Sequence, residues 1–331
     1  MKKSKKIVVI GGGTGTYSVL SGLRKFKNLK LSVVVTMMDS GGSNRVIRDE
    51  FGLLPTSDIR QCMVALTPEN TSEQLRELFT YRYSSGTGIA GMTFGNLFMA
   101  ALTDIYKNQE EAIEKTCELL NVQGNIYPVT FDDVHLVAKY DNGKEVLGEH
   151  LINEPDKSLG DTKIAGLKLS PKASANKKAL AAIKEADMII MGPGDLFTSV
   201  ICNLVVGGVS EAIRGSKAEK VYIVNLMTKF GETTNFSASE HLATLEKYLG
   251  TKINVCLVNK STKFPEGVLE RYGQEKAYPV KDDLKEGSGL KVVRGDFVSG
   301  AVYKQKESDK VKRSLIRHDS KKLAKALVEL L

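Results

Sequence analysis

The amino-acid sequence predicts an α/β protein with a Rossmann-like, doubly wound and mostly parallel sheet, into which an antiparallel β subdomain is inserted. Short apolar runs recur along the chain and end in glycine-rich loops, after which helical patterns begin. These runs are apolar nearly throughout, which is typical of parallel strands with helices on both faces. Between residues 126 and 169 apolar and polar residues alternate instead, and such alternation favours antiparallel strands.

The first third of the chain alternates between strands and helices. A β-branched run leads into the glycine loop Gly11–Thr16, and a valine-rich run leads into Asp39 and the loop Ser40–Ser43. Thr56–Asp58 stands where the N-cap of a helix belongs. The elements expected here are a strand at Ile7–Ile10, a helix from Val19 to Phe26, a strand at Leu31–Met38, and helices at Ile59–Leu66 and Asn96–Tyr106.

The middle of the chain predicts the antiparallel insertion, which we place at residues 122–170 of a single domain spanning residues 1–331. Asp141-Asn142-Gly143 is a strong signal for a hairpin turn within it. The α/β pattern then resumes, and Ser237 with Glu240 forms a capping box. The elements expected after the insertion are a strand at Met188–Met191, a helix from Thr198, strands at Val221–Met227 and Ile253–Val258, and a helix at Lys321–Leu331.

The composition is that of a globular, cytoplasmic protein. Hydrophobic residues make up 42% and charged residues 26% of the chain, so disorder is not expected. No apolar run is long enough for a signal-peptide core or a membrane span. The scattered cysteines fall in apolar runs, which predicts buried free thiols in a reducing compartment: Cys62, Cys117, Cys202 and Cys256.

The chain carries a net charge of +8, and much of the excess lies at its two ends. Such terminal clusters are usually solvated faces, and no basic stripe contains interleaved aromatic residues. We therefore predict no nucleic-acid partner, whereas the sequence leaves a homo-oligomer open. The basic residues at the ends are Lys2, Lys3, Lys5, Lys6, Lys312, Arg313, Arg317, Lys321, Lys322 and Lys325.

Four loops predict a binding site for an anion. In a parallel sheet the loops after the strands meet at one edge, where helix N-termini present unpaired backbone N–H groups and positive dipole ends. Small residues let an anion approach that backbone. The four loops together are much stronger evidence than one would be: Gly11–Thr16, Ser40–Ser43, Gly91–Asn96 and Gly192–Ser199. A phosphate-rich nucleotide is the expected ligand.

The type of nucleotide is open at this point. Asp39 ends the second strand, where the ribose-binding acid of a dinucleotide site would stand, but Thr16 occupies the place of the third glycine in the fingerprint. An NAD-dependent oxidoreductase is therefore disfavoured, and the absence of a GxxxxGK[ST] motif disfavours a P-loop NTPase. Asp39 and Asp58 could instead hold Mg²⁺ beside a diphosphate, although Asp58 could equally serve only as a helix cap. No tightly bound organic cofactor is expected.

Other polar side chains are weaker candidates. Arg60 could pair with a phosphate, although arginines often pair with nothing specific. Asn203 lies four residues after Ser199, on the same helix face, and could reach a ligand or serve only in helix packing. His241 follows the capping-box glutamate and could donate to a ligand or simply belong to the start of that helix.

The sequence elements that match a known family occur in one order along the chain. They are Gly11–Gly15, Asp39–Ser43, Asp58–Arg60, Phe94–Leu97, Tyr127–Thr130, Gly148–Glu149, Gly192–Ser199 and Asn225–Thr233. On these residues the chain resembles the gluconeogenesis factor family, a sister group of the 2-phospho-L-lactate transferases. The resemblance covers nearly the whole chain, and the elements Gly192–Ser199 and Asn225–Thr233 are the most specific.

The resemblance implies a Rossmann-like core with a nucleoside-diphosphate or nucleotide-sugar site at these loops. The sister transferases attach a phospholactyl-type group from a guanosine-diphosphate donor to a deazaflavin alcohol with Mg²⁺, and their acidic metal positions correspond to Asp39 and Asp58. The candidate ligand-binding residues from the loops and matched elements are Gly12, Gly13, Thr14, Gly15, Gly41, Gly42, Ser43, Arg60, Asn96, Gly192, Gly194, Asp195, Thr198, Ser199, Asn203 and Thr228.

The function expected from the resemblance is a cytoplasmic regulator that binds UDP-sugars and acts in cell shape and gluconeogenic carbon metabolism. The alternative is an Mg²⁺-dependent transferase with Asp39 and Asp58 at the metal, so enzymatic turnover is left open. Two departures from the family pattern bear on the site. Gln61 stands where an asparagine is usual, and Tyr17 replaces a smaller residue after the first glycine loop.

Overall fold

The computed structural model describes residues 4–69, 71, 73–156, 159, 162–287, 289–301 and 314–331. Of the basic residues at the chain ends, Lys2, Lys3, Lys312 and Arg313 lie outside these ranges. No helix in the described ranges has both the length and the apolar character needed to cross a membrane.

The large sheet contains seven parallel strands in the order β10-β9-β8-β7-β1-β2-β3, which confirms the predicted fold class. The central strand β1 hydrogen-bonds to β2 on one side and to β7 on the other, so the order of the strands reverses there. Crevices at such a reversal are where doubly wound sheets bind ligands. The strands are β1 (Lys5–Gly11), β2 (Leu29–Val35), β3 (Asn125–Pro128), β7 (Met188–Met191), β8 (Glu219–Ile223), β9 (Val255–Asn259) and β10 (Lys291–Gly295).

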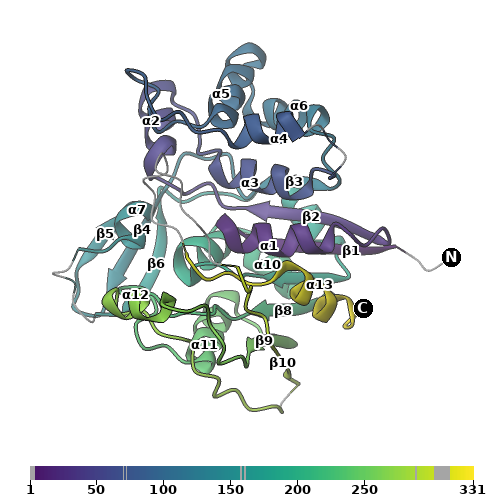
Figure 1. Ribbon diagram of the computed structural model, residues 1–331, viewed down its shortest axis with the longest axis vertical. Helices are drawn as coiled ribbons and strands as arrows, with labels where there is room; N and C mark the ends of the chain where they lie inside the picture. Colours follow the sequence, from purple (N-terminus) through teal and green to yellow (C-terminus); the bar gives the residue numbers. More distant parts are fainter. Residues whose placement is uncertain are drawn as a thin grey trace.

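Helices cover both faces of this sheet (Figure 1). Successive β1 side chains point to opposite faces, because Val8 and Ile10 pack in one apolar layer while Ile7 and Val9 pack in the other. One layer is completed by α8 (Lys177–Glu185), α10 (Val209–Gly215) and α11 (Ala238–Leu249). The other is completed by α1 (Gly13–Leu23), α3 (Ser57–Leu66) and α13 (Ser320–Val328).

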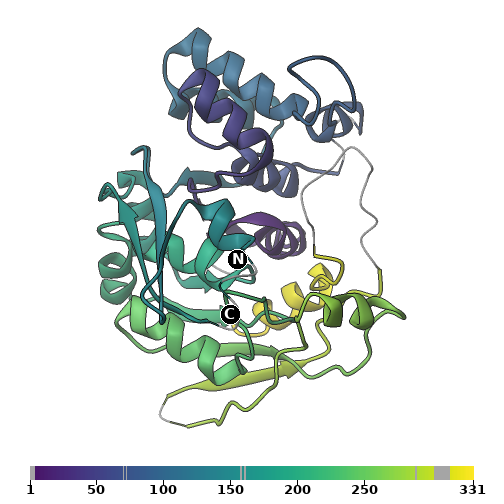
Figure 2. The same ribbon diagram turned by 90° about the vertical axis from the view of Figure 1, so that its left-hand side faces the viewer.

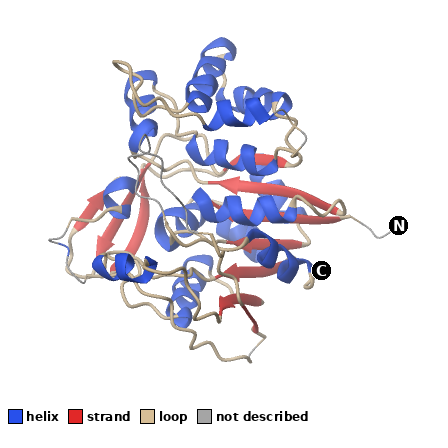
Figure 3. Ribbon diagram, viewed as in Figure 1, coloured by secondary structure: helices blue, strands red, loops and turns tan. Residues whose placement is uncertain are grey.

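A small antiparallel sheet in the order β5-β4-β6 lies beyond one end of the large-sheet strands (Figure 3). Its strands are β4 (His135–Tyr140), β5 (Glu145–Leu147) and β6 (Ile164–Ser170), with α7 (Glu149–Asn153) between the last two. The predicted hairpin turn joins β4 to β5, and Gly143 donates its N–H to the Tyr140 carbonyl. Because β3 pairs with β2 in the large sheet, the antiparallel sheet begins later in the chain than residue 122.

A group of helices stands over the β2–β3 edge of the sheet, at the top of Figures 1 and 2. It contains α2 (Gly42–Phe51), α4 (Glu73–Thr80), α5 (Phe94–Tyr106) and α6 (Gln109–Leu119). The remaining elements are the π-helical turn η2 (Leu196–Ile201), α9 (Cys202–Leu204) and α12 (Val268–Gln274).

Two strands end earlier than the apolar pattern predicted. β2 ends at Val35 instead of Met38, and β8 ends at Ile223 instead of Met227. Met37 and Met38 are nevertheless buried, so the apolar run continues as loop after the ladder has ended. These extensions place Thr36 and Asn225 at the rim of the sheet, where they line a cleft.

Candidate functional site

A single cleft of about 1320 Å³ runs along the carboxyl ends of the large-sheet strands. It is lined by the loops after β1, β2, β7 and β8, by α7, and by residues of α12 and of the segment before α13. Most candidate ligand residues meet there: Gly12, Gly13, Thr14, Gly15, Asp39, Gly41, Gly42, Asp58, Gly194, Asp195, Thr198, Ser199 and Thr228.

The first glycine loop turns β1 directly into α1. Gly12 is the N-cap of α1, and Gly13 has a φ of +65°, which a side chain would strain. Gly15 lies against the loop after β7, because a Cβ atom on it would overlap the Pro193 carbonyl. The first turn of α1 contains no acidic residue, so its backbone N–H groups and positive dipole end face the cleft uncompensated by side chains of that turn.

The second glycine loop begins α2 and is held by Asp39. The Asp39 carboxylate accepts hydrogen bonds from the Gly41 N–H at 2.9 Å and from the Asn44 side-chain amide at 2.6 Å. Gly41 is the N-cap of α2. Asp39 therefore organises this loop as well as facing the cleft.

Three carboxylates gather on this side of the cleft, and we call Asp39, Asp58 and Glu149 the carboxylate group. Asp58 accepts a hydrogen bond from the Gln61 amide at 3.3 Å, and a Cβ atom on Gly12 would overlap its carboxylate. Burial raises the pKa of Glu149 well above its usual value, and the nearby charges of Asp39 and Asp58 raise it further. The three carboxylates nevertheless do not form a ready metal site, because among the described residues no group of three or more His, Cys, Asp or Glu side chains is arranged so that it could hold a metal ion.

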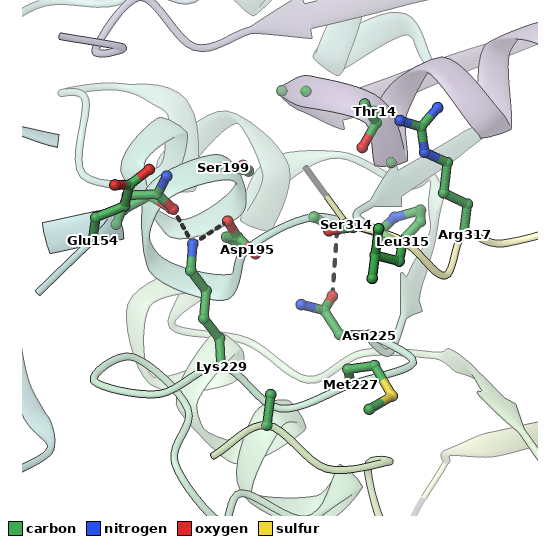
Figure 4. Close-up of a pocket in the computed structure, with 18 of the residues that line it drawn as sticks. Thr14, Glu154, Asp195, Ser199, Asn225, Met227, Lys229, Ser314, Leu315 and Arg317 are labelled. Atoms are coloured by element: carbon green, nitrogen blue, oxygen red, sulfur yellow. Dashed lines mark hydrogen bonds and ion pairs between the residues drawn. The ribbon is translucent and has the colours of Figure 1, made fainter. Parts of the chain in front are cut away.

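A second charged group is centred on a lysine, and we call Asp195, Lys229 and Glu232 the lysine group. Figure 4 shows Lys229 beside Asp195. The Lys229 ammonium lies 2.5 Å from Asp195 Oδ2 and 3.1 Å from Glu232 Oε1, and it also donates to the Asn153 side chain of α7. Glu232 is 1% exposed and also accepts a hydrogen bond from the Thr198 hydroxyl. The lysine group thus joins the loops after β7 and β8 to α7.

Burial and charge act against each other in the lysine group. Burial lowers the pKa of Lys229, but the carboxylates of Asp195 and Glu232 outweigh it and leave the pKa raised, so Lys229 stays charged. Burial raises the pKa of Glu232 to about 7; Lys229 opposes this rise, whereas Asp195 adds to it. Glu232 therefore titrates near neutral pH, at a buried position next to the cleft residue Lys229.

The part of the cleft beyond the lysine group is lined by both apolar and charged residues. Met227 and Leu315 line it, together with Tyr272, whose hydroxyl accepts a hydrogen bond from the Leu315 N–H at 3.0 Å. Its polar residues include Asn225 and His318. In Figure 4 Asn225, Met227 and Leu315 lie on the opposite side of Asp195 from Glu154.

Several candidate residues lie behind the cleft. Arg60 is buried and donates from Nε to Asn96 Oδ1 at 3.0 Å, and Asn96 in turn donates to Ser57 Oγ. Asn203 is fully buried and donates to the Ser199 carbonyl, which is the helix-packing alternative. These three side chains support cleft residues from behind and do not line the cleft.

Three further candidates are not among the residues that line the cleft. Gly192 lies just outside the lining residues, although the adjacent Pro193 and Gly194 belong to them. His241 is buried against the Tyr222 hydroxyl, so it does not line the cleft. Ser43 is in α2, and its side chain lies outside the described part of the structure.

The two departures from the family pattern have different surroundings. Gln61 lines the cleft and contacts Asp58, whereas Tyr17 packs against the apolar layer formed by α1, α3 and α13. The change at Gln61 therefore alters the cleft surface itself.

Sequence reasoning missed Glu149, Lys229 and His318 as site residues. Glu149 and Lys229 do occur within the matched elements Gly148–Glu149 and Asn225–Thr233, and this was the signal that could have found them. His318 stands before the last helix, in a segment with no loop pattern of its own.

The 2-phospho-L-lactate transferase CofD family model matches residues 7–298. A "Putative gluconeogenesis factor" of Thermoanaerobacterium thermosulfurigenes is 40% identical over 98% of this chain and 97% of its own length. The gluconeogenesis factor of Bacillus subtilis is 34% identical over 100% of this chain and 99% of its own.

The chain belongs to the gluconeogenesis factor family. This assignment confirms the resemblance seen in the sequence and places the chain within the wider CofD family. A crystal structure of a Bacillus halodurans protein has the same fold, with a TM-score of 0.87 and 33% identity over 98% of this chain and 100% of that chain. In this member of the gluconeogenesis factor family, the cleft described above lies at the carboxyl edge of the sheet.

Proposed function

We propose that the cleft binds a nucleoside-diphosphate-linked sugar of the UDP-sugar type. One observation carries the proposal: the glycine loops at Gly13, Gly42 and Gly194, far apart in the sequence, line one cleft. Helix N-termini favour phosphate groups through their free N–H groups and dipole, and the first turn of α1 adds no acid to oppose them.

The size of the cleft supports a ligand larger than a nucleotide alone. Its volume of about 1320 Å³ exceeds the roughly 300–1,000 Å³ of ordinary small-molecule pockets. A sugar attached to the diphosphate would use this additional space.

The biological role that we propose is regulation of cell shape and of gluconeogenic carbon metabolism in the cytoplasm. The names of the full-length relatives support the metabolic part of this role. Regulation requires only that occupancy of the cleft changes with the concentration of the ligand, and therefore needs no turnover.

Calorimetric titration with UDP-N-acetylglucosamine, UDP-glucose, GDP and NAD, each with and without Mg²⁺, tests the proposal. We expect saturable binding of a UDP-sugar. Thr14→Glu places a carboxylate in the first turn of α1, which suits the helix but repels phosphate, and should weaken binding at least about tenfold.

The matched control is Lys177→Glu, which adds an acid to the first turn of α8, outside the cleft, and should leave binding unchanged. Absence of saturable heat with every UDP-sugar would remove the proposal.

The carboxylate group favours a second candidate, an Mg²⁺-dependent transferase of the 2-phospho-L-lactate transferase type. Asp39 and Asp58 fit a magnesium ion by their chemistry, because Mg²⁺ is usually held by one or two carboxylates together with substrate phosphates. Burial raises the pKa of Glu149, and the charges of Asp39 and Asp58, which such an ion would offset, raise it further. Bound there, Mg²⁺ would neutralise diphosphate charge, while the α1 N-terminus orients the phosphates.

Mg²⁺ dependence separates the two candidates. For a transferase, Asp39→Asn and Asp58→Asn should each weaken Mg²⁺-dependent nucleotide binding by at least about tenfold, the loss typical even of residues that only support a metal ligand. Unchanged Mg²⁺ dependence in both variants would leave the transferase without its metal site.

A further inference from the structure

His318 places an unused hydrogen-bond acceptor in the wall of the cleft. It lies in the segment before α13 that bridges to Val298, and the residue lines the cleft although it is only 9% exposed. Among the described residues, His318 Nε2 has no hydrogen-bond partner. A buried ring nitrogen without a partner is costly, unless a ligand supplies the missing bond.

The other ring nitrogen decides what Nε2 can do. Burial lowers the pKa of His318 to about 4, and a hydrogen bond to the Val224 carbonyl opposes that shift. The imidazole is therefore neutral at physiological pH, and the nitrogen that bonds to a carbonyl must carry the proton. Because Nε2 has no partner, Nδ1 is that donor, and Nε2 is left as an acceptor.

Asn225 provides the complementary donor beside it. Asn225 directly follows Val224, the residue to which His318 bonds, and both Asn225 and His318 line the cleft. Asn225 Oδ1 accepts the Gly194 N–H at 3.3 Å, which orients the side-chain amide and leaves Nδ2 as its donor. The residues that carry this acceptor and this donor therefore both belong to the lining of the cleft.

The surroundings of this pair suit a flat, mostly apolar ring. Met227, Tyr272 and Leu315 line the cleft together with this pair and offer apolar surface for such a ring, while Arg317 lines it as well. The loop after β8 is two strands away from β1 in the sheet, or roughly 10 Å at the usual spacing of neighbouring strands. A ribose between base and phosphates would bridge a separation of this order.

We propose that His318 and Asn225 recognise the base of the bound nucleotide, with His318 Nε2 accepting the ring N–H of uracil or guanine and Asn225 Nδ2 donating to the adjacent carbonyl oxygen. Adenine and cytosine present a ring-nitrogen acceptor next to an exocyclic amine, which is the reverse pattern. The pair therefore selects against these two bases. This inference rests on the proposed function and names the residues that set its base specificity.

Methylated nucleotides test the proposal in the unaltered protein. Calorimetric titration with UDP, GDP, CDP and ADP should show UDP or GDP binding most tightly. Methylation of the ring N–H, as N3-methyl-UDP or N1-methyl-GDP, should weaken that ligand roughly tenfold to hundredfold, because it leaves a buried acceptor unpaired. Equal affinity for the parent and methylated nucleotides would overturn the proposal while leaving nucleotide binding itself intact.

Two variants locate the effect at His318. His318→Phe keeps a ring but removes the acceptor, so parent and methylated nucleotides should bind with equal affinity. His318→Gln places an amide oxygen near the position of Nε2 and should restore part of the preference. His135→Phe, at an exposed position of β4 outside the cleft, is the matched control and should discriminate as the unaltered protein does.

Retention of the full preference in His318→Phe would assign base recognition to another residue and overturn the proposal. If no nucleoside diphosphate binds the unaltered protein, the proposed function fails and the inference falls with it.

Discussion

The cleft contains two groups of carboxylates whose charges are balanced in different ways. In the lysine group, Asp195 and Glu232 contact the ammonium of Lys229. In the carboxylate group, the hydrogen bonds described above come from the neutral amides of Gly41, Asn44 and Gln61.

The comparison of the two groups indicates that a carboxylate at the rim of a sheet is not by itself a metal site. In the carboxylate group, burial raises the pKa of Glu149 well above its usual value, and the charges of Asp39 and Asp58 raise it further, whereas Lys229 lowers it. A lysine already supplies the positive charge in the lysine group. We therefore expect added Mg²⁺ to act on the carboxylate group and to leave the lysine group unaffected.

Removal of the lysine should have the largest effect. Lys229→Met leaves Asp195 and the buried Glu232 without their ammonium. We expect the free energy of unfolding to fall by about 3 kcal/mol, the low end for breaking a buried ion pair, because the Lys229 side chain is 27% exposed. Urea denaturation at pH 8 measures this loss.

Lys252→Met is the control, because this lysine is 84% exposed and should contribute less than about 1 kcal/mol through its ion pair. A loss as small as that of the control would mean that the lysine group does not depend on its cation.

The contact between the two glycine loops should give the next largest effect. Gly15→Ala places a Cβ atom against the Pro193 carbonyl, so the loop after β1 and the loop before Asp195 must separate. Overpacking of this kind costs about 1–3 kcal/mol, and the same variant should weaken nucleotide binding because it moves the α1 N-terminus.

Gly166→Ala is the control, because open space surrounds that glycine in β6. Denaturation and calorimetry on both variants measure the two effects. If Gly15→Ala behaves as Gly166→Ala does, the close approach of the two loops is not required.

The pH dependence of stability should report Glu232. Its pKa rises from the usual 4.5 to about 7 in the folded protein, so the folded state retains a proton that the unfolded chain has lost. This contribution is fully present below the unfolded pKa, and it is lost as the pH rises through about 7. Its slope is at most about 1.4 kcal/mol per pH unit.

Glu232→Gln lacks this loss, so its stability relative to the unaltered protein should rise between pH 5 and pH 7 and then level off. Denaturation series at four pH values measure the difference, with exposed Glu270→Gln as the control. Parallel curves for the unaltered protein and Glu232→Gln would contradict the assignment.

The smallest effect should be the change in the pKa of Glu149 caused by Asp39→Asn. The charge of Asp39 is one of the causes that raise the pKa of Glu149, so its removal should lower that pKa. Carbon-13 NMR titration of the glutamate carboxyl signals, with Glu149→Gln to identify the resonance, measures the shift. Asp49→Asn, at an exposed position of α2, should not change it. If Asp39→Asn leaves the pKa of Glu149 unchanged, the charge of Asp39 does not act on Glu149.

The fold class and three of the four glycine loops were predictable because they follow from local pattern, whereas no residue of the fourth loop, Gly91–Asn96, lines the cleft. A β-branched run, a glycine turn and a helix identify the β1–α1 unit without any distant contact. The same holds for the capping box of Ser237 and Glu240, which the structure contains.

The polar residues of the site were harder to predict because tertiary packing decides their surroundings. Arg60 and Asn96 fit a ligand pattern in the sequence, yet they bond to each other behind the cleft. Lys229 and Glu232 are three residues apart, but their joint role depends on Asp195 from another loop. The bridge to Val298 positions His318, and no spacing in the sequence predicts this bridge.

The position of β1 at the centre of the sheet also determines when the cleft can form during synthesis of the chain. β1 leaves the ribosome first, but its hydrogen-bonding partner β7 and the cleft residues 314–318 are translated much later. A nascent chain that has emerged only as far as the small sheet contains the first glycine loop without the loops that face it. The cleft is therefore complete only after residues 314–318 have been translated, and a chain truncated before β7 would expose an unpaired edge of β1.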